Sequence, residues 1–123
     1  MNTHADDRRI ARFDVFPDLP GSLNVVTLLP GAVCAWHMHK HQLDYYYVAK
    51  GLVKVGVTFT GSLPQFAVLK EGDRVFEVPV GVWHGYACVG NEPAILVTYC
   101  THKYDSADEA RKPPGPEWDR VNR

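Results

Sequence analysis

Hydrophobic and polar residues alternate over short stretches of the chain, and turn-forming residues separate these stretches. The segments rich in β-branched and aromatic residues are 10–16, 23–29, 33–39, 44–49, 52–60, 65–70, 74–78, 83–89 and 94–100. Glycine and proline mark the boundaries, for example at Pro30-Gly31 and Lys50-Gly51. No segment before residue 105 has the 3.6-residue apolar period of a helix. The pattern therefore predicts an all-β fold built from many short strands.

The end of the chain follows a different pattern. Ser106 and Glu109 have the spacing of a capping box, which predicts that a short helical turn begins here. The prolines within 113–116 prevent the helix from continuing. We expect Trp118, in an otherwise polar tail, to anchor that tail to the barrel or to a neighbouring subunit. The predicted organisation is a flexible N-terminal arm (1–9), a β-barrel (10–104), and a helical turn with an extended tail (105–123).

Composition narrows the environment and the partners. The 123 residues are enough for one domain with its own core. Charge is balanced, with 13 basic against 14 acidic residues and no basic stripe, so we do not expect a nucleic-acid partner. The three cysteines, Cys34, Cys88 and Cys100, are widely spaced and odd in number, which favours reduced thiols. Without a signal segment or a membrane-spanning run, we expect a cytoplasmic protein with no membrane partner.

Four residues have the spacing of a metal site. His37 and His39 are two apart on a predicted strand, so their side chains share a face. Asp44 begins the next strand after a turn, and His84 opens a later one. We therefore predict that His37, His39, Asp44 and His84 bind one divalent transition metal inside the barrel. Imidazole and carboxylate suit Fe, Mn, Zn, Ni and Co, so the pattern leaves the identity of the metal open.

Three further residues are candidates for catalysis. Tyr86 has the same strand parity as His84, which predicts that it lines the pocket. Tyr99 is a candidate general acid, although a structural hydroxyl also explains it. His41 continues the alternation of the two preceding histidines, either as a reserve ligand or at the pocket mouth. Arg74 is the one basic candidate for the pocket interior, so we expect a small carbonyl or polyol ligand rather than a nucleotide sugar.

These residues resemble the two motifs of the cupin superfamily. The first motif is matched by Gly31, His37, His39 and Gly51, and the second by Pro79, Gly81 and His84. Asp44 stands where the family has glutamate, Cys88 replaces an asparagine, and one extra residue precedes Pro79. The segments 78–86 and 94–101 are similar to the branch of dTDP-4-keto-6-deoxyglucose 3,5-epimerases, the RmlC-like cupins. The resemblance implies a jelly-roll barrel, that is a double-stranded β-helix, and a sugar-like ligand.

Several functions fit these observations. The leading hypothesis is a metal-dependent enzyme that isomerises or epimerises a small carbonyl or sugar-like substrate. The alternatives are an iron-dependent dioxygenase of a small molecule, a non-catalytic ligand-binding or sensing module, and a barrel that binds no ion. We also expect a homodimer in which the strand 10–16 or the Trp118 tail crosses to the partner, because an open sheet edge favours pairing.

Overall fold

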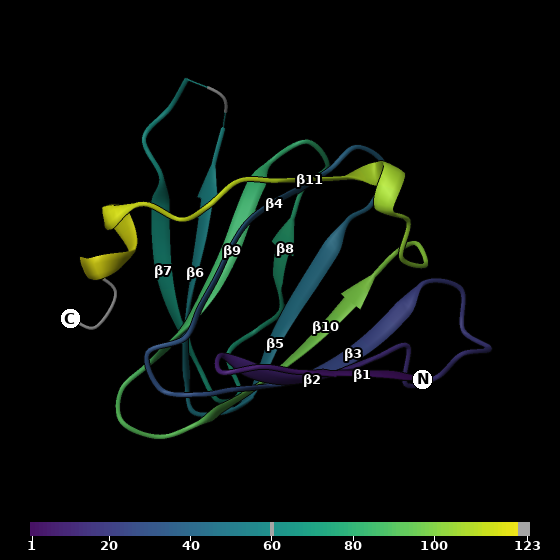
Figure 1. The fold of residues 1–123 in the computed structure, drawn as a ribbon, viewed down its shortest axis with the longest axis horizontal. Helices are drawn as coiled ribbons and strands as arrows, with labels where there is room; N and C mark the ends of the chain where they lie inside the picture. The colour runs from purple at the N-terminus through teal and green to yellow at the C-terminus, as the bar shows by residue number, and fades with distance from the viewer. Residues whose placement is uncertain (60, 121–123) are drawn as a thin grey trace.

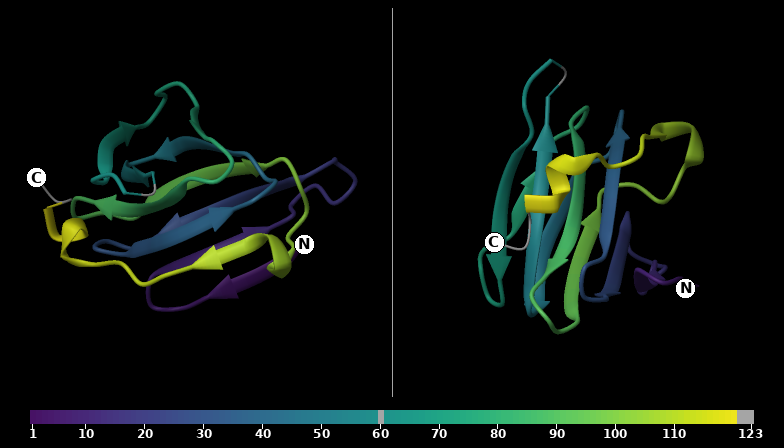
Figure 2. Two further views of the ribbon diagram at one scale, coloured as in Figure 1. Left: turned by 90° about the horizontal axis from the view of Figure 1, so that it is seen from above. Right: turned by 60° about the vertical axis from the view of Figure 1, so that its left-hand side comes forward.

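The chain folds into two antiparallel β-sheets that face each other (Figures 1 and 2). A computed structural model describes residues 1–59 and 61–120. The strands of the first sheet, in spatial order, are β1 (Asn2–Ala5), β2 (Arg9–Phe13), β3 (Ser22–Leu28), β10 (Ala94–Cys100), β5 (Asp44–Lys50) and β8 (Phe76–Val78). Those of the second are β11 (Glu109–Arg111), β4 (Val33–His39), β9 (Trp83–Val89), β6 (Leu52–Thr58) and β7 (Gln65–Lys70). Successive strands from β3 to β6 alternate between the sheets, as a jelly roll requires, so the predicted all-β class is confirmed.

The core lies between the two sheets, where alternate residues of each strand meet. In β3, every second residue is buried and the residues between are only partly covered. The most deeply buried side chains of this core are Val26, Leu28, Val48, Leu96, Val53, Val55, Val78, Cys34 and Cys88. The three cysteines are free thiols, as expected, and burial raises the pKa of Cys34. The polar residues that face the interior lie at one end of the barrel, where they line a cavity.

An irregularity in β4 sets the direction of its two histidines. The register between β4 and β9 shifts between Ala35 and His37. Cys34 belongs to the inner core, whereas both Ala35 and Trp36 pack in a cluster on the outer face of the sheet. Two successive residues therefore lie on the same side, and the alternation restarts with His37 facing inward. Because of this shift, His37 and His39 point toward the interior.

The C-terminal segment covers the outer face of the second sheet. Trp118 is 3% exposed, and its ring lies 5.1 Å from that of Trp36 and 5.0 Å from that of Phe66 between centroids. The indole N–H of Trp36 donates to the carboxylate of Glu117 at 2.9 Å. Trp118 thus anchors the tail to the barrel of its own chain, one of the two predicted outcomes.

Both ends of the chain differ from the prediction. The expected arm over 1–9 contains β1, which is hydrogen-bonded to β2 in a hairpin. The strand expected over 10–16 ends at Phe13, because Asp14 has a positive φ of 56° that interrupts extended backbone. The strand expected over 52–60 ends at Thr58. Its predicted last residue, 60, lies outside the residues that the structure describes, and so do residues 121–123 of the tail.

The predicted capping box is wrong. The turn there is a short 3₁₀ helix, η1 (Ser106–Asp108), and Asp105 caps it by accepting from the backbone N–H of Ala107. Glu109 instead begins β11, and a second 3₁₀ helix, η2 (Pro116–Arg120), contains Trp118. Within residues 1–59 and 61–120, no helix is long and apolar enough to cross a membrane.

Candidate metal centre

A cavity of about 720 Å³ lies at one end of the barrel. Side chains from both sheets line it, and so do residues of the N-terminal hairpin and of the C-terminal segment. The predicted site residues among its lining are His37, His39, Asp44, His84 and Tyr86. The size of the cavity is that of an ordinary small-molecule site.

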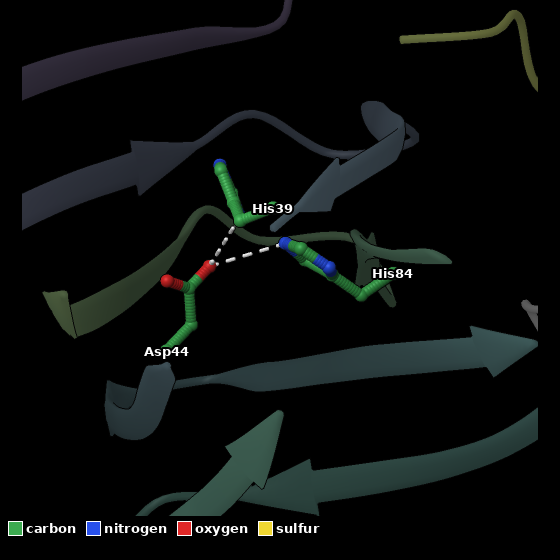
Figure 3. Close-up of side chains that lie close together, drawn as sticks. All are labelled: His39, Asp44 and His84. Atoms are coloured by element: carbon green, nitrogen blue, oxygen red, sulfur yellow. Dashed lines mark ion pairs between the residues drawn. The ribbon is translucent and has the colours of Figure 1, made fainter. Parts of the chain in front are cut away.

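Three of the four predicted metal ligands converge on one point of the cavity wall (Figure 3). His39, Asp44 and His84 each offer a ligand atom, and these atoms lie within 4.8 Å of one another. The Oδ2 atom of Asp44 is 3.1 Å from Nε2 of His84 and 3.8 Å from Nδ1 of His39. The three residues come from β5, β9 and β4, so both sheets contribute to the group.

The hydrogen bonds around this group fit a bound cation. Nδ1 of His84 lies 2.9 Å from the carbonyl oxygen of Val82, which can only accept, so Nδ1 carries the hydrogen. Nε2 faces a carboxylate oxygen of Asp44, and a proton on Nε2 in the metal-free protein occupies the place that a bound cation would take. Two such atoms at 3.1 Å repel each other unless a proton or a cation lies between them. Gln42 donates to the other oxygen, Oδ1, of Asp44 and leaves Oδ2 free to ligate.

The Asp44 carboxyl is buried but remains in its ionised form. Burial alone would raise its pKa, but the hydrogen bond with His84 and the neighbouring charge of that residue outweigh burial. The pKa of Asp44 is therefore lowered, and a carboxylate is available to ligate a metal at neutral pH.

His37 lies beside the group and does not belong to it. Its ring centroid is 6.2 Å from that of His84, whereas His39 approaches His84 to 5.2 Å. Burial, followed by the positive charge of His84, lowers the pKa of His37 to about 4. At neutral pH this imidazole is therefore uncharged, and it faces the cavity with a lone pair for an ion or a substrate proton.

Tyr86 lines the cavity, at the place that its strand parity predicts. Its hydroxyl accepts a hydrogen bond of 2.7 Å from Nη1 of Arg9. Burial raises the pKa of Tyr86 to about 12, so the hydroxyl keeps its proton. Its ring meets that of Tyr46 edge-to-face at 5.7 Å. Its role in catalysis stays a prediction.

The structure does not bring Tyr99 and His41 to this cavity. Tyr99 lies between Thr98 and Cys100 on β10, both of which line the cavity, so its own side chain points to the opposite face. Its hydroxyl donates to the carbonyl oxygen of Pro20. His41 is exposed, because the chain has left β4 before it and the strand parity no longer applies. Both side chains thus lie outside the lining.

The group of His39, Asp44 and His84 is called the metal group below. Sequence reasoning missed Glu109, which lies against this metal group. Its Oε2 atom is 3.5 Å from Nε2 of His39. The sequence offered one signal, the alternation of charged residues over 109–111, but three residues are too few to predict a strand.

The expectation of a weakly basic interior is also wrong. Arg74 is exposed and does not line the cavity. The basic residues that do line it, besides histidines, are Arg8, Arg9, Lys103 and Arg111. They come from the N-terminal hairpin and the C-terminal region, outside the motif strands to which the prediction was limited.

Comparison with known proteins places the chain in a family. Residues 24–100 match a family model described as "Cupin domain". The chain is 35% identical over 94 residues to the "Probable low-salt glycan biosynthesis epimerase Agl13" of Haloferax volcanii, which covers 68% of this chain and 60% of that protein. It is 27% identical over 99 residues to the "Spore coat polysaccharide biosynthesis protein SpsL" of Bacillus subtilis, covering 73% and 63%. The chain thus spans about three fifths of the length of these relatives.

Solved structures show the same fold. The capsular polysaccharide assembling protein CapF from Staphylococcus aureus superposes with a TM-score of 0.81 at 18% identity, over 89% of this chain and 31% of that one. The oxalate decarboxylase of Lactobacillus farciminis gives 0.76 at 22% identity, over 98% and 38%. Since the family model matches most of the chain, and the fold agrees with it, this protein belongs to the cupin family.

Proposed function

We propose that this cupin is a metal-dependent enzyme that isomerises or epimerises a sugar-like carbonyl substrate. The observation that carries the proposal is the convergence of His39, Asp44 and His84 on the wall of a cavity of about 720 Å³. The relative that is 35% identical and named as a glycan biosynthesis epimerase supports this class of reaction.

The metal group would hold the ion through Nδ1 of His39, Oδ2 of Asp44 and Nε2 of His84. A divalent cation in this place supplies Lewis-acid polarisation of a carbonyl oxygen, which acidifies the neighbouring C–H bond. The donors are nitrogen and oxygen atoms only, so Fe, Mn, Zn, Ni and Co all remain candidates.

Two residues beside the metal group are suited to move the proton. His37 is uncharged at neutral pH because its pKa is lowered to about 4, so its imidazole can accept a proton from substrate carbon. Tyr86 accepts from Arg9, and its own O–H remains available to donate to a substrate atom. Removal of a proton and its return to the opposite face or to the neighbouring carbon gives epimerisation or isomerisation without an oxidant.

The environment of Arg9 favours an anionic substrate over a neutral one. Among the described residues, Arg8 pairs with Asp6 and Lys103 with Asp14, but Arg9 forms no ion pair with a carboxylate. Its Nε atom is buried without a hydrogen-bond partner. A phosphate or carboxylate on the substrate would satisfy this guanidinium. We therefore propose a sugar that carries such a group, in place of the small carbonyl or polyol ligand expected from the sequence.

Proton exchange with solvent tests the reaction. The metal-loaded protein is incubated in D₂O with free, phosphorylated and nucleoside-diphosphate keto sugars, and NMR follows deuterium at the carbons next to the carbonyl. We expect exchange with an anionic member of the panel, and its loss in His84→Ala. The absence of exchange from every member, although metal and sugar are bound, would leave a ligand-binding module as the function.

The donor set also favours a second candidate. Two histidines and one carboxylate form the facial set of non-haem Fe(II) oxygenases. An oxygen electrode separates the two enzymes, because a dioxygenase consumes O₂ during turnover and an epimerase does not. Consumption that matches substrate loss in the iron-loaded protein would replace the first proposal with the second.

A further inference from the structure

The C-terminal segment lies along the strand that carries His37 and His39. Strand β11 lies along β4 (Figure 1), and the antiparallel register places Glu109 directly opposite His39. Opposite residues of an antiparallel pair project to the same face of the sheet. Glu109 therefore points into the cavity beside His39, although it lies outside the residues 24–100 that match the cupin model.

The imidazole of His39 has a carboxylate beside each of its nitrogen atoms. Nε2 is 3.5 Å from Oε2 of Glu109, and Nδ1 is 3.8 Å from Oδ2 of Asp44. The side chains of His39 and Glu109 are each 12% exposed, so water screens the interaction little. A neutral imidazole has one N–H and one lone pair, and the two carboxylates compete for the N–H.

Several contacts fix the segment that carries Glu109. Oδ1 of Asp108 accepts from the backbone N–H groups of Lys40 and His41 at 2.9 and 3.0 Å. The backbones of Lys112 and Trp36 exchange hydrogen bonds of 2.8 and 3.2 Å. Arg111 pairs with the other oxygen, Oε1, of Glu109. The backbone is thus fixed before and after Glu109, and Arg111 holds the carboxylate in front of His39.

We infer that Glu109 is a positioning residue of the metal centre: it holds the hydrogen of His39 on Nε2 and so turns the lone pair of Nδ1 toward the ion. A metal-bound histidine commonly gives its second N–H to a carboxylate in this way, and loss of that partner lowers metal affinity by about 10- to 100-fold. The inference rests on the proposed metal site, but the tautomer of His39 in the metal-free protein tests it separately.

The experiment compares Glu109→Ala and Glu109→Gln with Glu71→Gln, a control in an exposed turn that does not line the cavity. The affinity for Zn²⁺ is measured by competition with a chelator, and ¹⁵N NMR of the metal-free proteins reports the tautomer of His39. We expect the Ala variant to bind Zn²⁺ 10- to 100-fold more weakly and to lose the preference for hydrogen on Nε2. The Gln variant, whose amide oxygen still accepts, should fall between it and the wild type.

The results for Glu109→Ala and for the wild type test the role of Glu109 separately from the metal site. Unchanged affinity and an unchanged tautomer in Glu109→Ala would overturn it and leave the metal site intact. Weaker binding with an unchanged tautomer would also overturn it, because Glu109 would then act as a ligand. If the wild type binds no Zn²⁺, the proposed function fails. The tautomer of His39 in the metal-free proteins then still shows whether Glu109 holds the hydrogen on Nε2. If the Ala variant does not fold, the Gln variant gives the same comparison.

Discussion

At the scale of single residues, the protonation of each cavity histidine depends on its immediate neighbours. His39 lies between two carboxylates: burial alone would lower its pKa, but Glu109 raises it on balance. His37, without a carboxylate at such a distance among the described residues, has its pKa lowered. The pKa values of two histidines on one strand are therefore shifted in opposite directions, and His37, whose pKa is lowered, keeps a free lone pair at neutral pH.

This difference predicts a pH dependence of stability for His37. Its pKa falls from 6.5 in the unfolded chain to about 4 in the fold, so folding favours the neutral ring. The associated stability is complete above pH 6.5 and is lost as the pH falls toward 4. We expect the metal-free wild type to lose about 2 kcal/mol more than His37→Asn between pH 7 and 4.5. Urea unfolding in EDTA measures this, and parallel curves for the two proteins would contradict it.

Arg9 gives a second prediction at this scale. Because its guanidinium forms no ion pair with a carboxylate in the described chain, it should contribute to the binding of anionic sugars and not of neutral ones. Arg9→Gln should weaken the binding of a phosphorylated sugar about tenfold or more, in line with the loss of a charge-assisted contact. Calorimetry with the phosphorylated and the free sugar tests this, and the control is Arg12→Gln, at an exposed position of β2. Equal weakening for both sugars would refute the anion role.

At the scale of elements, the motif strands were predictable and the peripheral ones were not. The bounds of β4, β7, β9 and β10 agree with the prediction, because β-prone residues and flanking turns define them locally. Strands β1 and β11 have few buried residues, and their pairing depends on a partner strand that the local sequence does not reveal. Glu109 was missed for this reason: its spacing from Ser106 fits a capping box, but pairing with β4 determines its conformation.

Spacing along the sequence was enough to predict the three ligands that meet in the structure. His39, Asp44 and His84 each lie near the end of a strand at this edge of the barrel, and the cupin motifs fix their order. The separation of His37 was not predictable, because it depends on the orientation of its side chain beyond the shared face. The basic lining likewise depends on tertiary placement of the hairpin.

The tail should contribute strongly to stability. Trp118 packs between Trp36 and Phe66 and holds the segment that continues from β11. Trp118→Ala would leave a cavity and is expected to cost about 3 kcal/mol of unfolding free energy. Chemical denaturation measures this, with Tyr104→Ala as an exposed aromatic control. A loss below about 1 kcal/mol would show that the tail is not fixed by this contact.

At the scale of the whole molecule, the two outer faces differ. Trp118 and its segment cover the outer face of the second sheet, whereas apolar side chains stand side by side on the outer face of the first: Val25 opposite Val97, and Val97 opposite Tyr47. Tyr47 is 41% exposed. An antiparallel sheet that faces water usually presents polar residues there.

We therefore propose a homodimer that buries the outer face of the first sheet, rather than one in which the Trp118 tail crosses to the partner. Light scattering after gel filtration at micromolar concentration should give twice the chain mass of 13.8 kDa. Val97→Lys should give a monomer, because a charge would enter the interface. A monomeric wild type would exclude this assembly under those conditions.

We propose that His39, Asp44 and His84 form the metal centre and that His37 stands beside it. Elemental analysis of protein purified without a polyhistidine tag tests this most directly, on the wild type, His84→Ala and His37→Ala. We expect about one divalent transition metal per chain in the wild type and in His37→Ala, and a loss of at least tenfold in His84→Ala. Stoichiometric metal in His84→Ala would contradict it.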